Sequence, residues 1–131
     1  MNTVNGNTTP KKLLVIDDDA NIRKILTKLL RSITKEGYEI HTAESGEKAI
    51  SMAEKNAFEI AFIDMQLPGI DGLDTFRALK KINRNIVVVM MTGAASQERI
   101  EGALREGAVT CMSKPFSLSD VEEILKKKIK L

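Results

Sequence analysis

The chain has 131 residues, of which 43% are hydrophobic and 29% are charged, and its formal net charge is +2. This length suits one domain with one core, and no window approaches the roughly 18 uninterrupted apolar residues of a membrane span. The small net charge does not support nucleic-acid binding, and the single cysteine, Cys111, excludes an internal disulfide.

The first ten residues are polar and lack the basic start and apolar stretch of a signal peptide. We therefore expect a flexible tail over residues 1–10, a single domain over residues 11–131, and a soluble protein in the cytoplasm. After the tail, apolar runs typical of buried parallel strands alternate with stretches whose apolar residues recur at helical spacing.

The predicted strands cover residues 13–16, 38–42, 58–63, 86–91 and 109–112. The predicted helices cover about 22–33, 45–53, 73–82, 96–105 and 118–130. This alternation predicts an α/β fold with a parallel sheet covered on both faces. The run at 86–91 is the most hydrophobic in the chain, so we expect it to form a central strand.

Polar side chains stand at the carboxyl ends of four predicted strands. They are Asp17, Asp18 and Asp19 after the first, Asp64 after the third, Thr92 after the fourth, and Ser113 and Lys114 after the fifth. Ligands of open parallel sheets bind outside these ends, so we expect the side chains to meet in one site. Carboxylate oxygens suit Mg²⁺, and a bound cation would offset the repulsion between neighbouring aspartates.

Asp64 stands alone at its strand end and is therefore the expected nucleophile for a phosphoryl group, with Lys114 and Thr92 holding the transferred oxygens. Each residue taken singly also has a structural explanation. An aspartate after a strand can cap the next helix, and Asp64 precedes a Pro-Gly turn. The matched chemistry at four strand ends favours a functional site.

Five segments of the sequence resemble the receiver domain of two-component response regulators. They are VIDDDANIR, TAESGEKAI, FIDMQLPGIDG, MMTG and MSKPF, in the order and spacing of that family, and the resemblance covers about residues 11–130. It implies a flavodoxin-like (βα)5 doubly wound sheet with strand order 2-1-3-4-5. It also implies that Asp64 accepts a phosphoryl group from a phosphohistidine on a sensor histidine kinase or a phosphotransfer protein.

The resemblance also assigns roles to individual residues. The implied magnesium ligands are Asp18, Asp64 and the backbone carbonyl of Gln66, with Asp17 acting through a water molecule. Lys114 is expected to pair with the phosphoryl group and to precede a cis peptide bond to Pro115, whereas Thr92 is expected to move toward the phosphoryl group. We interpret Asp19 as a helix-start residue, against the alternative of a direct metal ligand.

Several positions depart from the family pattern or stay open. Cys111 stands where the family often has an aromatic residue, and we interpret it as a small buried hydrophobe rather than a redox sensor. Gln66 and Ala94 occupy positions that in this family influence how fast the aspartyl phosphate hydrolyses, so the lifetime of the implied phosphate is open. His41, the single histidine, is interpreted as an ordinary exposed strand residue.

The expected function is a signalling switch, with no catalysis beyond self-phosphorylation and auto-dephosphorylation at Asp64. One alternative is a haloacid-dehalogenase-like phosphatase using Asp17 and Asp19, and another is a binding module that never accepts phosphate. A downstream target or output domain is expected on the face formed by the fourth helix, fifth strand and fifth helix. We expect a monomer or a weak phosphorylation-dependent dimer, without direct contact to nucleic acid or membrane.

Overall fold

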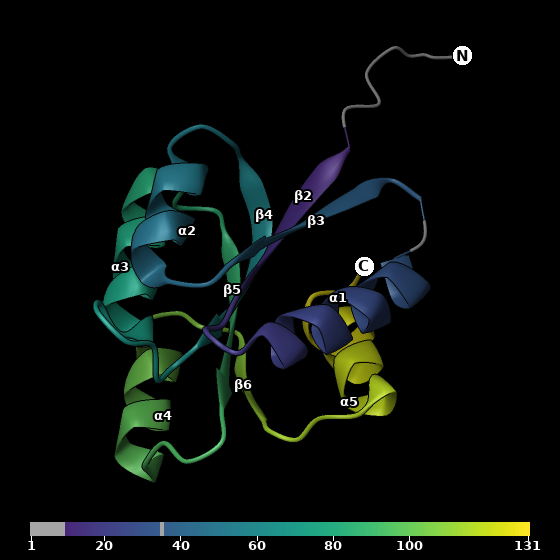
Figure 1. Ribbon diagram of the computed structural model, residues 1–131. Coiled ribbons are helices and arrows are strands. Elements are labelled where there is room, and N and C mark those ends of the chain that lie inside the picture. Colours follow the sequence, from purple (N-terminus) through teal and green to yellow (C-terminus); the bar gives the residue numbers. More distant parts are fainter. Residues whose placement is uncertain (1–9, 35) are drawn as a thin grey trace.

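The computed structural model describes residues 10–34 and 36–131, so the predicted tail lies outside the described residues except for Pro10. Five strands form one sheet (Figure 1). The strands are β2 (Lys11–Ile16), β3 (Tyr38–Ala43), β4 (Phe58–Asp64), β5 (Val87–Thr92) and β6 (Thr110–Ser113). The helices are α1 (Ala20–Thr34), α2 (Gly46–Ala53), α3 (Gly72–Ile82), α4 (Gln97–Arg105), α5 (Leu118–Glu123) and the π-helix η1 (Ile124–Lys128).

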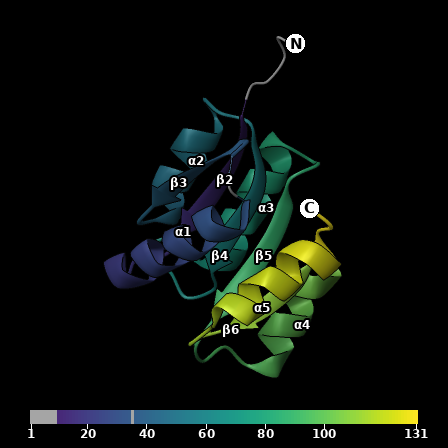
Figure 2. The same ribbon diagram turned by 90° about the vertical axis from the view of Figure 1, so that its right-hand side faces the viewer.

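The strands lie in the order β3-β2-β4-β5-β6, and every neighbouring pair is parallel. Counted along the chain this is the order 2-1-3-4-5, which confirms the predicted flavodoxin-like fold. The helices α2, α3 and α4 cover one face of the sheet, and α1 and α5 cover the other (Figures 1 and 2). The hydrophobic run predicted to be central forms β5, which lies between β4 and β6, while β4 takes the middle position.

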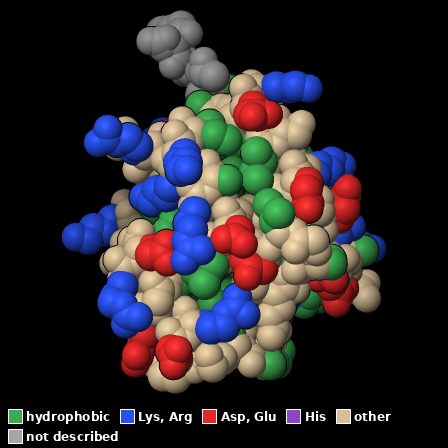
Figure 3. All heavy atoms as spheres, turned by 90° about the vertical axis from the view of Figure 1, so that its left-hand side faces the viewer, with side chains coloured by type: hydrophobic (Ala, Val, Ile, Leu, Met, Phe, Trp, Pro, Cys, Tyr) green, Lys and Arg blue, Asp and Glu red, His purple; other side chains and the backbone are tan. Residues whose placement is uncertain are grey.

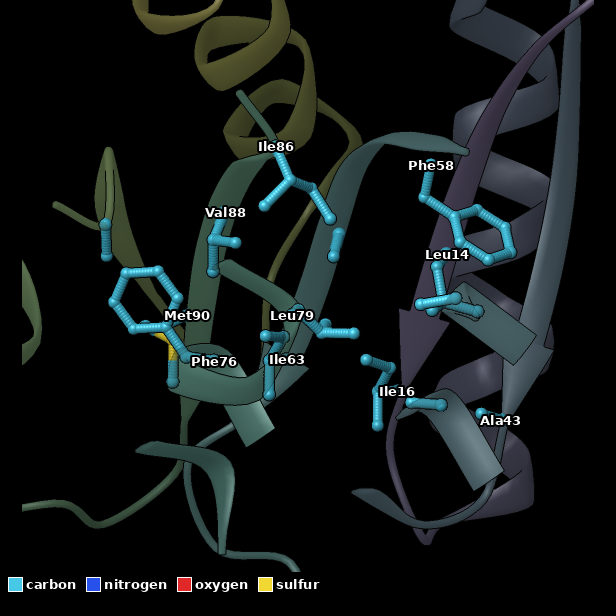
Figure 4. Packing of buried hydrophobic residues seen from close by; sticks show 14 of the residues in the cluster. Leu14, Ile16, Ala43, Phe58, Ile63, Phe76, Leu79, Ile86, Val88 and Met90 are labelled. Atoms are coloured by element: carbon cyan, nitrogen blue, oxygen red, sulfur yellow. The ribbon is translucent and has the colours of Figure 1, made fainter. Parts of the chain in front are cut away.

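Two hydrophobic clusters form because side chains of a strand alternate between the faces of the sheet. In β2, Leu14 and Ile16 belong to the cluster under α2, α3 and α4, which Figure 4 shows from close by. Leu13 and Val15 belong to the cluster under α1 and α5. All four side chains are fully buried, so the strand is fixed from both sides.

Polar caps start most of the helices, as the sequence predicts for α2. The Ser45 hydroxyl accepts from Lys48 N at 3.1 Å, and Asp71 and Ser96 cap α3 and α4 in the same way. Ser117 caps α5 with a reciprocal capping box.

Three details differ from the predicted elements. The last helix becomes a π-helix at Ile124, with Ile129 N donating to Ile124 O, a spacing that a 3.6-residue apolar period does not reveal. Ile25 belongs to the apolar residues that recur at helical spacing over 22–33, yet it is 48% exposed, and Ile82, the last residue of α3, is 41% exposed. Among residues 10–34 and 36–131, none of the helices combines the length and apolar character that a membrane crossing requires.

Candidate functional site

The polar residues predicted at the strand ends meet at one edge of the sheet. Asp17 follows β2 directly, Asp64 ends β4, Thr92 ends β5, and Lys114 follows β6. Backbone hydrogen bonds continue the sheet at this edge, because Asp17 N donates to Ala43 O at 3.2 Å and Lys114 N donates to Thr92 O at 2.8 Å. The side chains of Asp17, Asp64 and Thr92 are buried, so the sheet fixes their positions.

The Lys114 ammonium group bridges two of the carboxylates. Its Nζ lies 2.6 Å from Asp17 Oδ2 and 3.2 Å from Asp64 Oδ2, and its side chain is 19% exposed. These three residues stand at the carboxyl ends of β2, β4 and β6, which are far apart in the sequence. The fold therefore places one positive charge between two negative charges that would otherwise repel each other.

Burial and charge act together on this cluster. Burial raises the pKa of the Asp17 carboxyl, an effect that hydrogen bonds from Lys114 and Asp19 oppose without cancelling it. For Lys114, burial lowers the pKa, but the hydrogen bond and charge of Asp17, together with Asp64, outweigh burial and raise the pKa overall. The lysine is consequently held in its charged form.

An acidic cluster opens from the buried edge toward solvent. Carboxylate oxygens of Asp17, Asp18 and Asp64 lie within 4.8 Å of one another, and Asp18 is exposed. Hard oxygen donors at this spacing fit Mg²⁺, which commonly binds one or two protein carboxylates and keeps several waters. Asp19 lies outside this cluster: its Oδ1 accepts from Asn21 N at 2.8 Å at the start of α1, which confirms its interpretation as a helix-start residue.

The two remaining groups at the site are held by local hydrogen bonds. Thr92 Oγ1 accepts from Ala94 N at 3.1 Å and from Ala95 N at 2.7 Å, which leaves the hydroxyl hydrogen free to point elsewhere. Gln66 N donates to Asp64 Oδ1 at 3.0 Å, so the peptide of Gln66 lies at the acidic cluster. The peptide bond from Lys114 to Pro115 is cis, as the family resemblance implies.

Gly72 allows α3 to start close to the site. A Cβ atom at this position would meet the Asp64 carbonyl oxygen and, at 2.6 Å, the Met65 Cα atom. The Gly72 amide donates to Met65 O at 3.2 Å. The backbone beside Asp64 is thus packed directly against the first residue of a helix, which only a residue without a side chain permits.

Sequence reasoning missed two supporting side chains. Arg23 Nη1 donates to Asp17 O at 2.8 Å and holds the turn between β2 and α1. Glu47 in α2 accepts from Ile70 N at 3.2 Å and holds the loop between β4 and α3. Arg23 offered a weak signal, since it is a cation one helical turn after the aspartates, but the Glu47 contact spans 23 residues and has no local signature.

Cys111 and His41 lie away from the acidic cluster. Cys111 is half-buried in β6, and burial raises the pKa of its thiol, which disfavours a reactive thiolate. His41 Nε2 lies 3.1 Å from Glu39 Oε1, and its ring packs edge-on against Phe58 with centroids 5.5 Å apart. His41 is thus half-buried and not exposed as the sequence predicted, because its ring packs on Phe58, and Cys111 is half-buried rather than fully buried.

Comparisons with known proteins identify the class. The sequence profile of the response regulator receiver domain matches residues 13–126, so the chain belongs to this family of two-component signalling domains. It is 31% identical to sporulation initiation phosphotransferase F of Bacillus subtilis over 121 residues, which are 92% of this chain and 95% of that protein. It is 32% identical to the transcriptional regulatory protein ZraR of Escherichia coli over 115 residues, 88% of this chain but only 25% of that protein.

Solved structures agree with this assignment. In the Borrelia burgdorferi CheX-CheY-BeF3-Mg²⁺ complex, the similar chain has a TM-score of 0.80 and 26% identity over 89% of this chain and 87% of that chain. The chain thus spans nearly all of one curated relative and about a quarter of another. Receiver domains are signalling domains and not conventional enzymes, which agrees with the expectation from the sequence.

Proposed function

We propose that this chain is a phosphorylation-dependent switch in which Asp64 accepts a phosphoryl group from a phosphohistidine of a sensor histidine kinase or phosphotransfer protein. The observation that carries this proposal is the convergence of Asp64, Lys114 and the acidic cluster at one sheet edge. Membership of the receiver family and the near end-to-end match to a sporulation phosphotransferase support it.

In the proposed transfer, a carboxylate oxygen of Asp64 attacks phosphorus as the bond from phosphorus to the histidine nitrogen breaks. The product is an aspartyl phosphate, and the imidazole leaves with the bonding electron pair. Lys114 Nζ, already 3.2 Å from Asp64 Oδ2, is placed to pair with a transferred oxygen. The free hydroxyl hydrogen of Thr92 is available to a second oxygen once that group approaches.

Asp18, Asp64 and the backbone carbonyl of Gln66 are the proposed magnesium ligands, and Asp17 is proposed to act through a water molecule. When bound, Mg²⁺ supplies positive charge that allows a carboxylate and a phosphoryl group to approach each other. The three carboxylates within 4.8 Å of one another support this assignment. Asp17 differs from Asp18 in being fully buried and bonded to Lys114, which suits an indirect role.

The same site would limit the lifetime of the aspartyl phosphate by auto-dephosphorylation. Ala94 has no polar side-chain group to orient an attacking water, whereas the Gln66 side chain is exposed beside the site. We propose that residues 11–131 act as one receiver domain in the cytoplasm, as a monomer or a weak phosphorylation-dependent dimer. A downstream target or output domain is proposed to bind across α4, β6 and α5, without direct contact to nucleic acid or membrane.

The phosphatase alternative has less support. It requires Asp17 as nucleophile and Asp19 as acid or base, but Asp17 is buried against Lys114 and Asp19 caps α1. The remaining alternative, a module that binds a metal without accepting phosphate, differs from our proposal only in the chemistry of Asp64.

Intact-mass spectrometry after incubation with Mg²⁺ and acetyl phosphate tests the proposal. We expect one phosphoryl group on the wild type, none on Asp64→Asn, and one on the matched control Asp74→Asn, whose carboxylate lies on α3 with a 60% exposed side chain. Absence of any addition, with magnesium binding still measurable by calorimetry, would favour the binding module. Addition that persists in Asp64→Asn but disappears in Asp17→Asn would favour the phosphatase chemistry.

A further inference from the structure

A groove of about 490 Å³ runs between α1 and the outer strand β3. Figure 1 shows these two elements side by side at the right of the molecule. Four cationic side chains of α1 line the groove, together with Ile40 and Thr42 of β3. The cationic residues are Arg23, Lys24, Lys28 and Arg31.

The charged side chains of α1 are all basic. Its sequence, ANIRKILTKLLRSIT, contains no aspartate or glutamate, whereas the other four α-helices formed by the described residues each contain at least one. The face of α2, α3 and α4 shows acidic and basic side chains interleaved (Figure 3). An ordinary solvated helix face mixes both signs because exposed pairs at three- and four-residue spacing are mildly stabilising.

Three of these cations have no ion-pair partner among residues 10–34 and 36–131. Lys24, Lys28 and Arg31 are exposed, and no ion pair between residues described by the structure involves them. By contrast, Lys126 and Lys127 near the C-terminus lie within 4.0 Å of glutamate oxygens one turn away. Within the part of the chain that the structure describes, these three positive charges consequently have no acidic partner.

We propose that the groove between α1 and β3 binds an acidic helix of a partner protein. Lys24, Lys28 and Arg31 follow each other at spacings of four and three residues and span about 10 Å along the helix axis. A second helix that lies along α1 can carry three carboxylates at the same spacing. Each of these carboxylates then lies beside one of the three cations. Such a match gives orientation and a fast encounter more than raw affinity.

A protein helix fits better than a nucleic acid. The whole chain has a net charge of only +2 and carries 18 acidic residues, so a long polyanion extending past the groove meets like charges. No aromatic residue is among the groove-lining residues that the structure describes, so there is no stacking platform for unpaired bases. Ile40 adds an apolar contact suited to the aliphatic stripe of an amphipathic helix.

The experiment titrates ¹⁵N-labelled full-length chain with a synthetic 15-residue helical peptide bearing glutamates at spacings of four and three residues. We expect saturable amide shifts confined to α1 and β3, weakened by added salt and absent with a peptide carrying glutamine instead. The pair Lys24→Glu and Lys28→Glu should weaken binding by about tenfold or more. Neither magnesium nor a phosphodonor is present, so the result is independent of phosphorylation at Asp64.

The control pair is Lys81→Glu and Arg84→Glu, two exposed cations at the end of α3 that change the net charge by the same amount. This pair should bind the peptide as the wild type does, and circular dichroism checks that both variants are folded. The proposal is overturned if no saturable shift occurs, if the control pair loses binding equally, or if the glutamine peptide binds as well. If a duplex oligonucleotide binds more tightly than the acidic peptide and shifts the same amides, the proposal is overturned and the ligand of the groove is a nucleic acid.

Discussion

At the scale of single residues, Gly72 shows how closely the backbone packs against the segment that carries Asp64. The variant Gly72→Ala forces Asp64 and Met65 to move, because the new methyl group overlaps the Asp64 carbonyl. We expect a loss of about 1–3 kcal/mol in the free energy of unfolding and slower phosphorylation. Urea denaturation and timed intact-mass measurements check both effects.

Gly102 provides the matched control for this prediction. It lies inside α4, and a Cβ atom there comes no closer than 4.0 Å to a neighbouring side chain. Gly102→Ala should therefore stabilise the protein by about 0.5–1 kcal/mol and leave phosphorylation unchanged. Equal behaviour of the two alanine variants would show that the contact at Gly72 is not constraining.

Arg23 can influence the proposed magnesium binding in two opposite ways. Whether Arg23→Ala weakens or tightens magnesium binding distinguishes them. If its hydrogen bond to Asp17 O holds the acidic turn in place, Arg23→Ala should weaken magnesium binding by about tenfold. If only its charge matters, removal of a nearby cation should tighten binding. Calorimetric titration of the wild type, Arg23→Ala, Arg23→Lys and the exposed neighbour control Lys24→Ala measures this, and we expect the first outcome.

At the scale of elements, an ion-pair network links α3 to the end of α4. Arg77 donates to both carboxylate oxygens of Glu106 at 2.7 Å and to Asp74 at 3.0 Å. The hydrogen bond from Arg77, with the charge of its guanidinium, lowers the pKa of Glu106. A carboxyl group whose pKa is lower in the folded than in the unfolded protein stabilises the folded state, and this contribution is complete above the ordinary, unfolded-state pKa. The contribution is lost as the pH falls toward and through the lower pKa of the folded state.

Glu106→Gln should accordingly lower the midpoint of thermal unfolding by a few degrees at neutral pH. The difference from the wild type should begin to shrink below about pH 4.5, the ordinary glutamate value, and disappear once Glu106 is protonated in the folded protein. The control Glu101→Gln, on the exposed side of α4, should show no such dependence. A difference that stays constant down to acid pH would contradict the assigned role.

The helices and strands show which features the sequence can predict and which depend on tertiary packing. Strand ends, the Ser45 cap and the role of Asp19 depend on neighbours within a few residues, and all were predictable from local rules. The convergence of Asp17 and Lys114, which are 97 residues apart, followed only from the rule that parallel strands share a carboxyl edge. The exposure of Ile25 and the start of the π-helix depend on tertiary packing, which a periodic pattern does not contain.

At the scale of the whole molecule, the sheet separates two hydrophobic clusters. Ile16 packs into the cluster under α2, α3 and α4, and Ile60 packs into the one under α1 and α5. We expect Ile16→Val and Ile60→Val each to cost about 0.5–1.5 kcal/mol of unfolding free energy. The double variant should lose the sum of the two, since residues without shared partners are close to additive.

Urea denaturation of the wild type, both single variants and the double variant measures this additivity. A single cooperative transition should persist throughout, because the strands that carry one cluster also carry the other. A double variant that loses far more or far less than the sum would mean that the sheet transmits strain between its faces.

The edge position of β6 has a consequence for how the site opens. Asp17 follows β2 and Asp64 ends β4, and both strands are paired on both sides, but Lys114 follows a four-residue strand at the border of the sheet. Short border strands exchange their amide hydrogens through local opening, whereas interior strands exchange only when the whole molecule unfolds. We therefore expect the amide hydrogens of β6 to exchange faster than those of β2 and β4, so that the lysine depends on a less protected strand than the aspartates do.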